Sequence, residues 1–269
     1  MRPLADGESW THALAGMVSA HKLKGLTCRV VLSGEDYKLL TAEAPAVPDA
    51  EIDQALLWNL RSVLEAPPQE IVVQSFPFAA GLNRPGPGMR HVITARKNRI
   101  QALVKGIQDA GLSLSSIDIP ELALRNIASR LPENAVGLGL VSQSTRHVVI
   151  TMYRADELYV TRQLAGITSL DGASQAQTVQ RLIEQLGLDL LRTLDYYDSQ
   201  LQQRPPAAIY LQPLPGNTSA LLGGLSDTLR LPVRQLRLED VLPGGESLTP
   251  EVQAACLSAL GGALRRETV

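Results

Sequence analysis

The sequence offers few residues whose type and spacing suit catalysis. Gly137-Leu138-Gly139 follows a strand-like run, but no third glycine opens a helix after it. A dinucleotide-binding turn needs that third glycine and a downstream carboxylate. Neither a Gly-x-Ser-x-Gly nucleophile turn nor a Gly-x4-Gly-Lys-Ser/Thr phosphate loop is present. Close packing of strands accounts for the two glycines, and we expect no catalytic residue.

The residues that could ligate a metal are not spaced as a site. A metal centre needs three or four converging nitrogen, oxygen or sulfur ligands. No histidine stands at ligand spacing from a second histidine or a cysteine, and the two cysteines lie far apart in the sequence. These residues are His12, His21, His91, His147, Cys28 and Cys256. We expect no metal, histidines on the solvated surface, and a reducing compartment.

Charge and aromatic content argue against nucleic acid as a partner. The 25 Lys+Arg and 27 Asp+Glu residues give a formal net charge of −2, whereas a nucleic-acid footprint requires a basic excess. The densest basic stretch, residues 90–99, is interpreted as the charged start of a surface helix. With 4% aromatic residues, stacking platforms are poorly supplied. The pair Tyr196-Tyr197 allows one ring to face the core while the other meets a partner, but core packing alone also explains both rings.

No segment has the composition of a membrane anchor. Residues 1–6 lack an apolar signal core, and no run of about 18 apolar residues occurs. The longest uncharged stretch, residues 205–226, contains four prolines. We expect a soluble protein that reaches a membrane only through a partner.

Hydrophobic periodicity predicts alternating helices and strands in the first half. A helix around residues 10–18 is capped by Ser9 and ends near Gly25. Residues 28–32 and 37–41 are predicted to form a β-hairpin across a Ser-Gly-Glu-Asp turn. The remaining predicted elements are a helix over 49–65 with Trp58 near its apolar side, strands 71–76 and 89–95 flanking a mobile loop 79–88, helix 97–110, strand 114–119 and helix 121–131.

The second half begins with a strand meander and continues with helices. The predicted elements are strands 135–141, 148–153 and 158–164, a helix over 173–202 interrupted or kinked near Gly187, strand 208–211, helix 218–229, strand 233–238 and helix 249–264. This order is typical of an α/β (mixed α+β) fold. We predict two similarly built halves, residues 1–165 and 166–269, with a subdomain inserted in the first.

Three segments resemble a known family. They are residues 117–126 (Ile-Asp-Ile-Pro-Glu-Leu-Ala-Leu-Arg-Asn), residues 43–48 leading into 52–58, and residues 193–197 (Thr-Leu-Asp-Tyr-Tyr). Together they are similar to actin-like pilus biogenesis proteins of the PilM/MshI type, in the MSHA (mannose-sensitive hemagglutinin) branch. The resemblance implies an actin-like (ASKHA) fold with a subdomain inserted at about residues 44–113.

The resemblance also implies partners and a location. Family members are cytosolic proteins, peripheral to the bacterial inner membrane, that grip the cytoplasmic N-terminal tail of a single-pass, PilN-like partner. They link the assembly platform to the rest of the machinery, including the pilus assembly ATPase, and actin-like relatives can form homo-oligomers. We place the tail in a groove near residues 28–32 and 121–128, where it could extend a sheet edge.

The nucleotide loops that the family uses are degenerate in this sequence. The first belongs to a glycine-containing N-terminal strand pair of the family, and we expect this sequence to begin after that pair. The Asp-x-Gly turn of the second is replaced by Gly139-Leu140-Val141, with Ser144 and Thr145 retained, and the adenosine-side Gly-Gly-Gly run by Pro213-Leu214-Pro215, with Gly216 retained. Proline removes a backbone donor, and the missing carboxylate would have organised Mg²⁺. We expect no cofactor and no ATP hydrolysis.

Two function classes therefore remain in view. The first is a non-catalytic adaptor of a type IV, MSHA-type pilus platform. The alternative is an actin-like ATP- and Mg²⁺-binding protein with drifted loops, or the cytoplasmic domain of a type II secretion protein.

Overall fold

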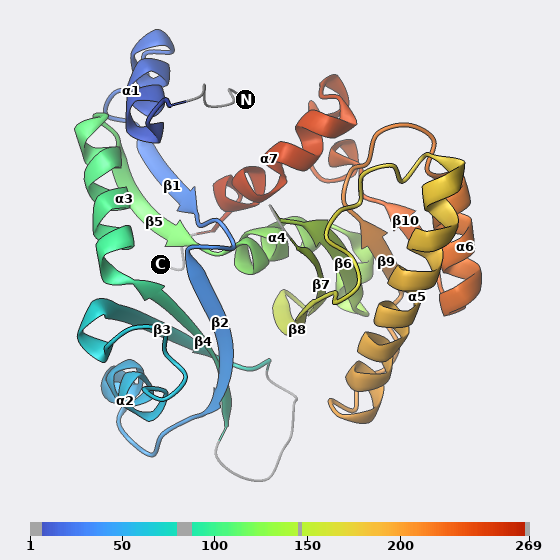
Figure 1. Ribbon diagram of the computed structural model, residues 1–269, viewed down its shortest axis with the longest axis horizontal. Coiled ribbons are helices and arrows are strands. Elements are labelled where there is room, and N and C mark those ends of the chain that lie inside the picture. The colour runs from blue at the N-terminus through green and yellow to red at the C-terminus, as the bar shows by residue number, and fades with distance from the viewer. Residues whose placement is uncertain (1–6, 80–87, 145–146, 267–269) are drawn as a thin grey trace. The chain divides into compact units, whose positions relative to one another are not determined.

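The computed structural model describes residues 7–79, 88–144 and 147–266 (Figure 1). The chain divides into two compact units, Met1–Ile119 and Pro120–Val269. Residue 165, where the sequence predicts the two halves to meet, lies inside the second unit, and the division into halves stays a prediction. Most of the predicted mobile loop 79–88 lies outside the described residues.

The first unit consists of helices and two small sheets. Its helices are α1 (Trp10–Ala20), α2 (Ile52–Asn59) and α3 (Lys97–Asp109), and its strands are β1 (Thr27–Val31), β2 (Tyr37–Glu43), β3 (Ile71–Pro77), β4 (Met89–Arg96) and β5 (Ser113–Asp118). Ser9 caps α1 by accepting a hydrogen bond from the His12 amide, as the sequence predicts.

The predicted hairpin of residues 28–32 and 37–41 is wrong. β1 pairs with β5 in parallel, and the amide of Leu32 extends that pairing by donating to the carbonyl of Asp118 at 2.9 Å. β2 pairs instead with β4, in the antiparallel sheet β2-β4-β3. The turn between β1 and β2, closed from Asp36 N to Ser33 O, carries the chain from one sheet into the other. Alternation identified both strands, but it does not specify a strand's partner.

Helix α2 covers one face of the sheet β2-β4-β3. Ile52 and Leu56 of α2 form a buried cluster with Val92 of β4. The predicted helix over 49–65 is shorter in the structure, because a 3₁₀ turn occupies Asp49–Glu51 and α2 ends at Asn59. Residues 61–63 are exposed, so no apolar side chain requires the helix to continue along the sheet.

The second unit is built on one five-stranded mixed sheet. The strand order is β10-β9-β6-β7-β8. Its helices are α4 (Pro120–Ala128), α5 (Ala176–Ser199), α6 (Ser219–Leu229) and α7 (Pro250–Ala263), and its strands are β6 (Leu138–Gln143), β7 (Val148–Arg154), β8 (Glu157–Gln163), β9 (Ala208–Leu211) and β10 (Val233–Gln235). β9 runs parallel to β6 and to β10, whereas β7 is antiparallel to β6 and to β8.

Glycines in the helices of the second unit permit close packing. α5 runs without interruption from 176 to 199, so an interruption near Gly187 is wrong, and the alternative of a kink there stays a prediction. A Cβ atom at Gly187 would lie 2.9 Å from Thr228 Cγ2 of α6, which explains the glycine as a helix contact. On α7, a Cβ atom at Gly261 would overlap the backbone of Ala123 in α4, and Asn126 Nδ2 donates to the Gly261 carbonyl at 2.9 Å. The crossing of α4 and α7 therefore depends on glycine.

Candidate functional site

Two phenylalanines and a buried histidine form an aromatic cluster in the first unit. Phe76 and Phe78 are the only phenylalanines in the sequence. The ring of His91 on β4 stacks on Phe78 with centroids 4.2 Å apart, and the Phe76 ring lies at 4.9 Å, tilted by 32°. His91 is only 2% exposed, so the prediction of a solvated surface histidine is wrong at this position. A histidine that directly follows a charged residue, Arg90, gives little sequence signal of this burial.

The aromatic cluster lies on the sheet face opposite α2. Val92 packs against α2, and adjacent strand residues point to opposite faces, so His91 faces the other way. The register places further apolar, half-buried side chains on this second face, namely Tyr37, Leu39, Val72 and Ile93. Antiparallel sheets commonly keep one face polar. Here this face is mixed, because the same register also places the exposed polar residues Thr41, Glu43 and Gln74 on it. We call the apolar set, with Phe76 and Phe78, the aromatic face.

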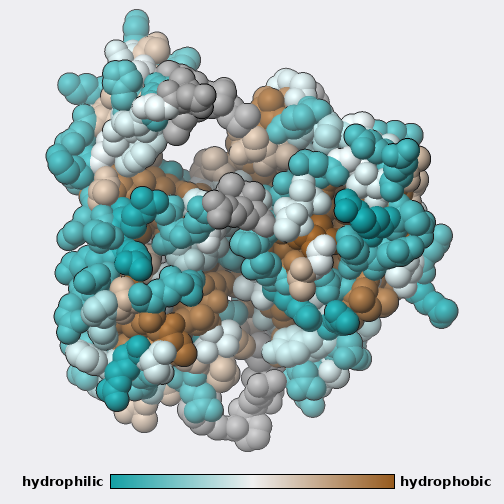
Figure 2. Space-filling model, viewed as in Figure 1, coloured by the Kyte–Doolittle hydropathy of each residue, from teal (hydrophilic) through white to brown (hydrophobic). Residues whose placement is uncertain are grey.

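The edge of β1 provides a second feature suited to an extended peptide. Within the described residues, β1 pairs with β5 alone. A strand without a second neighbour presents backbone N–H and C=O groups that another strand can pair with. Its turn leads directly into β2 (Figure 1), so the same unit holds this edge and the aromatic face. Figure 2 shows apolar atoms at the surface in the part of the unit that contains α2 and the sheet β2-β4-β3.

The two segments predicted to flank a groove, residues 28–32 and 121–128, belong to different units. Residues 28–32 belong to β1 and its continuation, and they are half-buried or buried. Residues 121–128 belong to α4, which buries Ala123, Leu124 and Ile127. The phenol of Tyr153 on β7 donates to the carbonyl of Glu121 at 2.7 Å, which fixes α4 to the sheet of its own unit. The groove stays a prediction.

The basic residues predicted to start a surface helix are divided between structural roles. α3 begins at Lys97, which confirms the helix start. Arg99 pairs with Asp36 at 2.9 Å, whereas Arg90 lies in β4 and donates from Nε to Ser75 Oγ at 2.9 Å. These residues therefore brace the first unit rather than form one continuous anion site.

Gly139 occupies a packed apolar position in β6. A Cβ atom there would collide with Ile209 Cδ1 and would lie 3.0 Å from Met152 Sδ and 3.1 Å from Ile150 Cδ1. The residue is buried. A carboxylate at position 139 would have neither the space nor the hydrogen-bond partners that a buried charge requires. The carboxylate that would organise Mg²⁺ in the family's second loop therefore does not fit.

The end of β6 is held by the protein's own side chains. The amide of Gln143 donates to Gln212 Oε1 at 2.7 Å, and Gln143 Oε1 accepts from the amide of Leu170 at 2.7 Å. The amide of Ser144 donates to the carbonyl of His147 at 2.8 Å, which closes the turn toward β7. Thr145 lies outside the described residues. The Ser144 amide is thus already engaged where a phosphate would need donors.

Gly216 is the retained residue of the third loop. Its φ of +75° favours glycine, and a Cβ atom would lie 2.7 Å from Ser174 Oγ. Leu214, just before it, is buried, and its carbonyl accepts from Gln235 Nε2 at 2.9 Å. Pro213 and Pro215 lack the amide donors of a glycine run. The residues present do not fit an ATP–Mg²⁺ site.

Neither metal ligation nor membrane insertion is supported within the described part of the chain. Across residues 7–79, 88–144 and 147–266, no group of three His, Cys, Asp or Glu side chains could hold a metal ion. No helix in these ranges has the length and hydrophobicity to cross a bilayer. Tyr197 is 1% exposed and Tyr196 is 42% exposed, so of the two alternatives for this pair, core packing of both rings is wrong.

Comparisons with known proteins reveal the fold. No protein-family model matches the sequence, and no curated protein matches it either. A chain of the PilM-PilN type IV pilus biogenesis complex superposes with a TM-score of 0.71 and 19% identity, covering 98% of this chain and 89% of that chain.

Two further solved structures are more distant. The cytoplasmic domain of EpsL, an inner-membrane component of the type II secretion system of Vibrio cholerae, has a TM-score of 0.46 and 14% identity over 81% of this chain and 80% of that chain. A Bacteroides thetaiotaomicron protein with an actin-like ATPase fold has a TM-score of 0.48 and 10% identity over 91% of this chain and 82% of that chain. The superposition at a TM-score of 0.71 shows that the chain has the fold of that chain of the PilM-PilN complex, in agreement with the fold that the sequence resemblance implies.

Proposed function

We propose that the protein is a non-catalytic cytoplasmic adaptor of a type IV pilus assembly platform, of the MSHA type. In this proposal it binds the cytoplasmic tail of a PilN-like, single-pass inner-membrane protein and couples it to the rest of the machinery, including the assembly ATPase. The observation that carries the proposal is the superposition, over 98% of the chain, on a protein solved in a complex named for PilM and PilN.

The first unit supplies surfaces that suit such a tail. An extended segment adding to the edge of β1 would gain backbone hydrogen bonds, and its alternate side chains would lie on the same side of the sheet. The aromatic face, with Phe76 and Phe78 on His91, offers contacts for apolar side chains of the tail. Aromatic rings are favoured anchors because they contribute large contact areas at a small entropy cost.

The nucleotide-loop positions support an adaptor rather than an ATPase. Gly139 has no room for a carboxylate, the Ser144 amide is paired with His147, and two prolines flank Leu214. Binding a phosphate at these loops would require free backbone donors and a Mg²⁺-organising acid. In this proposal the retained Ser144 and Gly216 are remnants of nucleotide-binding loops that no longer bind a nucleotide.

A titration with tail peptides tests the proposal. Fluorescently labelled N-terminal tails of single-pass pilus platform proteins from the same genome are titrated with the full chain, and anisotropy reports binding. Phe78→Ala should weaken binding at least tenfold. Trp58→Ala is the matched control, because Trp58 is 48% exposed on α2, which covers the other face. The proposal fails if a folded sample binds none of these tails, and the aromatic face is excluded as the site if Phe78→Ala binds as tightly as the control.

A further inference from the structure

The outward side of α5 carries exposed leucines. Leu188 is 51% exposed and Leu191 is 42% exposed. The inward side of the helix buries Val179, Leu182, Leu186, Leu190, Thr193 and Tyr197. At 3.6 residues per turn, Leu188 lies on nearly the opposite side of the helix from this buried stripe. α6 contacts a third side, through Gly187 and Thr228, and leaves the outward side open.

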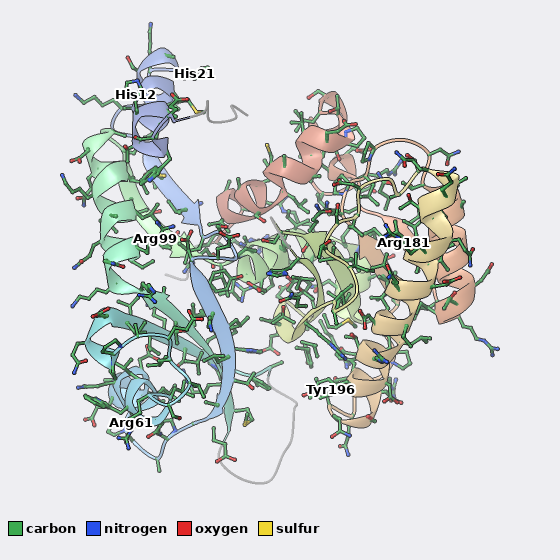
Figure 3. All side chains as sticks on the ribbon, viewed as in Figure 1. His12, His21, Arg61, Arg99, Arg181 and Tyr196 are labelled. Atoms are coloured by element: carbon green, nitrogen blue, oxygen red, sulfur yellow. The ribbon has the colours of Figure 1, made fainter. Side chains whose placement is uncertain are left out.

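Four charged residues flank Leu188, two on each side and at equal distances from it in the sequence. Residues at the same distance from Leu188 carry opposite charges. Arg181 and Glu184 precede Leu188 by seven and four residues, and Arg192 and Asp195 follow it by four and seven. These spacings of three and four residues place all five side chains on one helix face. All five are exposed. Figure 3 labels Arg181 and Tyr196 toward opposite ends of α5. Tyr196 directly follows Asp195, so the two labels mark how far the charged residues extend along the helix.

We propose that this face binds a second copy of the chain, with the two α5 helices antiparallel about a two-fold axis at Leu188. In a two-fold contact, residue i of one copy meets residue j of the other and the reverse. An axis at Leu188 brings Arg181 opposite Asp195 of the second copy and Glu184 opposite Arg192 of the second copy. Each pair occurs twice, so four attractive pairs flank a Leu188–Leu188 contact.

The charge pattern favours a second copy of the chain as the partner and an antiparallel orientation of the two α5 helices. Parallel pairing in register would place Arg181 against Arg181 and Asp195 against Asp195, which like-charge repulsion disfavours. Only the antiparallel arrangement opposes every positive residue of the face with a negative one. The inference is independent of tail binding, which involves the first unit.

Contacts within the chain leave these charges able to pair. Glu184 Oε1 accepts a hydrogen bond from Gln180 Nε2 at 2.9 Å, and Arg192 Nη1 lies 3.5 Å from Asp189 Oδ1. The first contact lies at the surface and is weak. In the second, the Asp189 side chain is only 7% exposed, and its Oδ2 also accepts a hydrogen bond from the Ala165 amide at 3.1 Å, so Asp189 does not depend on Arg192 alone. Glu184 retains a second carboxylate oxygen, and Arg192 retains further guanidinium donors. Because a single helix pair buries less than about 1,200 Å², the dimer should be weak and concentration-dependent.

Cysteine crosslinking tests the axis. Helix axes pack about 8–10 Å apart, and Cα atoms lie about 2.3 Å from each axis, so facing Cα atoms come within disulfide range. In a Cys28→Ser/Cys256→Ser background, Leu188→Cys should form a disulfide-linked dimer under mild oxidation. Gln177→Cys is the control, exposed on the same helix. Residue 177 of each copy would lie about 33 Å apart along antiparallel helices, at 1.5 Å per residue, so it should stay monomeric.

Charge exchange tests the pairing. Asp195→Arg should weaken dimerisation about fivefold in sedimentation equilibrium at low salt, because two attractive pairs become repulsive. Arg181→Asp/Asp195→Arg should restore it. The two positions lie about 21 Å apart in their own helix at 1.5 Å per residue, so the restoration requires a second copy. A monomer at several hundred micromolar, equal crosslinking at positions 177 and 188, or failure of the double exchange to restore dimerisation would each overturn the proposal.

Discussion

Ile209 of β9 fills the space into which a side chain at Gly139 of β6 would project. The register pairs these two residues across the parallel strands, and both are buried. The position that holds an acidic residue in the family resemblance is thus part of the apolar core. Glycine at this position leaves room for the side chains of Ile209, Met152 and Ile150.

Restoring the carboxylate should damage the fold rather than create a nucleotide site. Gly139→Asp places a charge among Ile209, Met152 and Ile150, and a buried unpaired charge combined with overpacking costs more than about 3 kcal/mol. Urea denaturation should show this loss of unfolding free energy. Gly137→Asp provides the comparison, since the atom nearest to a Cβ there is 3.5 Å away, although its φ of +123° adds strain of its own. Wild-type stability in Gly139→Asp would contradict the packing argument.

ATP with Mg²⁺ should give no binding heat with the wild-type chain. The donors at the end of β6 are engaged by Gln212 and His147, so a phosphate would have to displace internal hydrogen bonds. Isothermal titration calorimetry at millimolar ATP, with and without Mg²⁺, measures this directly. Micromolar binding that disappears in Ser144→Ala would favour the nucleotide-binding alternative instead.

Two neighbouring positions on α2 should respond very differently to truncation. Leu56 is fully buried in the cluster with Ile52 and Val92, whereas Trp58 is 48% exposed. Leu56→Ala should lower the unfolding free energy by about 2–5 kcal/mol, and Trp58→Ala by less than about 1 kcal/mol. Chemical denaturation of both variants gives the comparison. A larger loss for Trp58→Ala would mean that the indole ring is part of the core.

A carboxylate in the second unit should make stability depend on pH. Burial alone would raise the pKa of Glu133, but hydrogen bonds from Tyr210 Oη at 2.9 Å and from Arg234 lower it below its ordinary value. A depressed pKa contributes stability that is complete above the unfolded-state pKa, about 4.3, and is lost as the pH falls through the folded-state pKa.

Glu133→Gln should therefore lower the unfolding free energy at pH 7 by about 1–2 kcal/mol. The difference from wild type should shrink as the pH falls below about 4. Denaturation curves at pH 7, 5 and 3.5 measure it. Glu157→Gln is a matched control on β8, and a difference that stays constant with pH would exclude the ionised Glu133 as its cause.

The sequence predicts the elements of this fold better than their partners. Period-two and helical patterns located β1, β2, α3 and α5, because burial of one face leaves a local signal. A local pattern does not predict that β1 pairs with β5, because β5 follows in the sequence only after all strands of the sheet β2-β4-β3. Short turns such as Ser33–Asp36 look alike whether they close a hairpin or connect two sheets.

The candidate site shows the same division between local and long-range information. Loss of the Asp-x-Gly turn is visible at Gly139, because the residue type itself carries the chemistry. Burial of His91 between Phe76 and Phe78 is not visible, since it depends on the register of β3 with β4. Once that register is known, the only two phenylalanines in the chain are seen to lie beside His91, and their positions then indicate its burial.

Two helix glycines should differ in their tolerance of alanine, because different groups oppose them. Alanine in place of glycine favours a helix interior by about 1 kcal/mol. At Gly106 the added methyl group meets the ring of Trp10 and lies 2.8 Å from Thr11 Cγ2. Both are ends of side chains on α1, and Trp10 is 40% exposed, so they can rotate aside and Gly106→Ala should be close to neutral. At Gly261 it meets the backbone of Ala123, which cannot move without separating α4 from α7, and overpacking of this kind costs about 1–3 kcal/mol.

Thermal unfolding of both variants tests this contrast. Gly261→Ala should lower the Tm by several degrees, because a loss of about 1 kcal/mol shifts the midpoint of a domain of this size by about 2–4 °C. Gly106→Ala should leave the Tm within about one such step of the wild-type value. Equal losses would mean that the Trp10 ring is as fixed as the α4 backbone, and equal tolerance would mean that α7 can shift away from α4 at no cost.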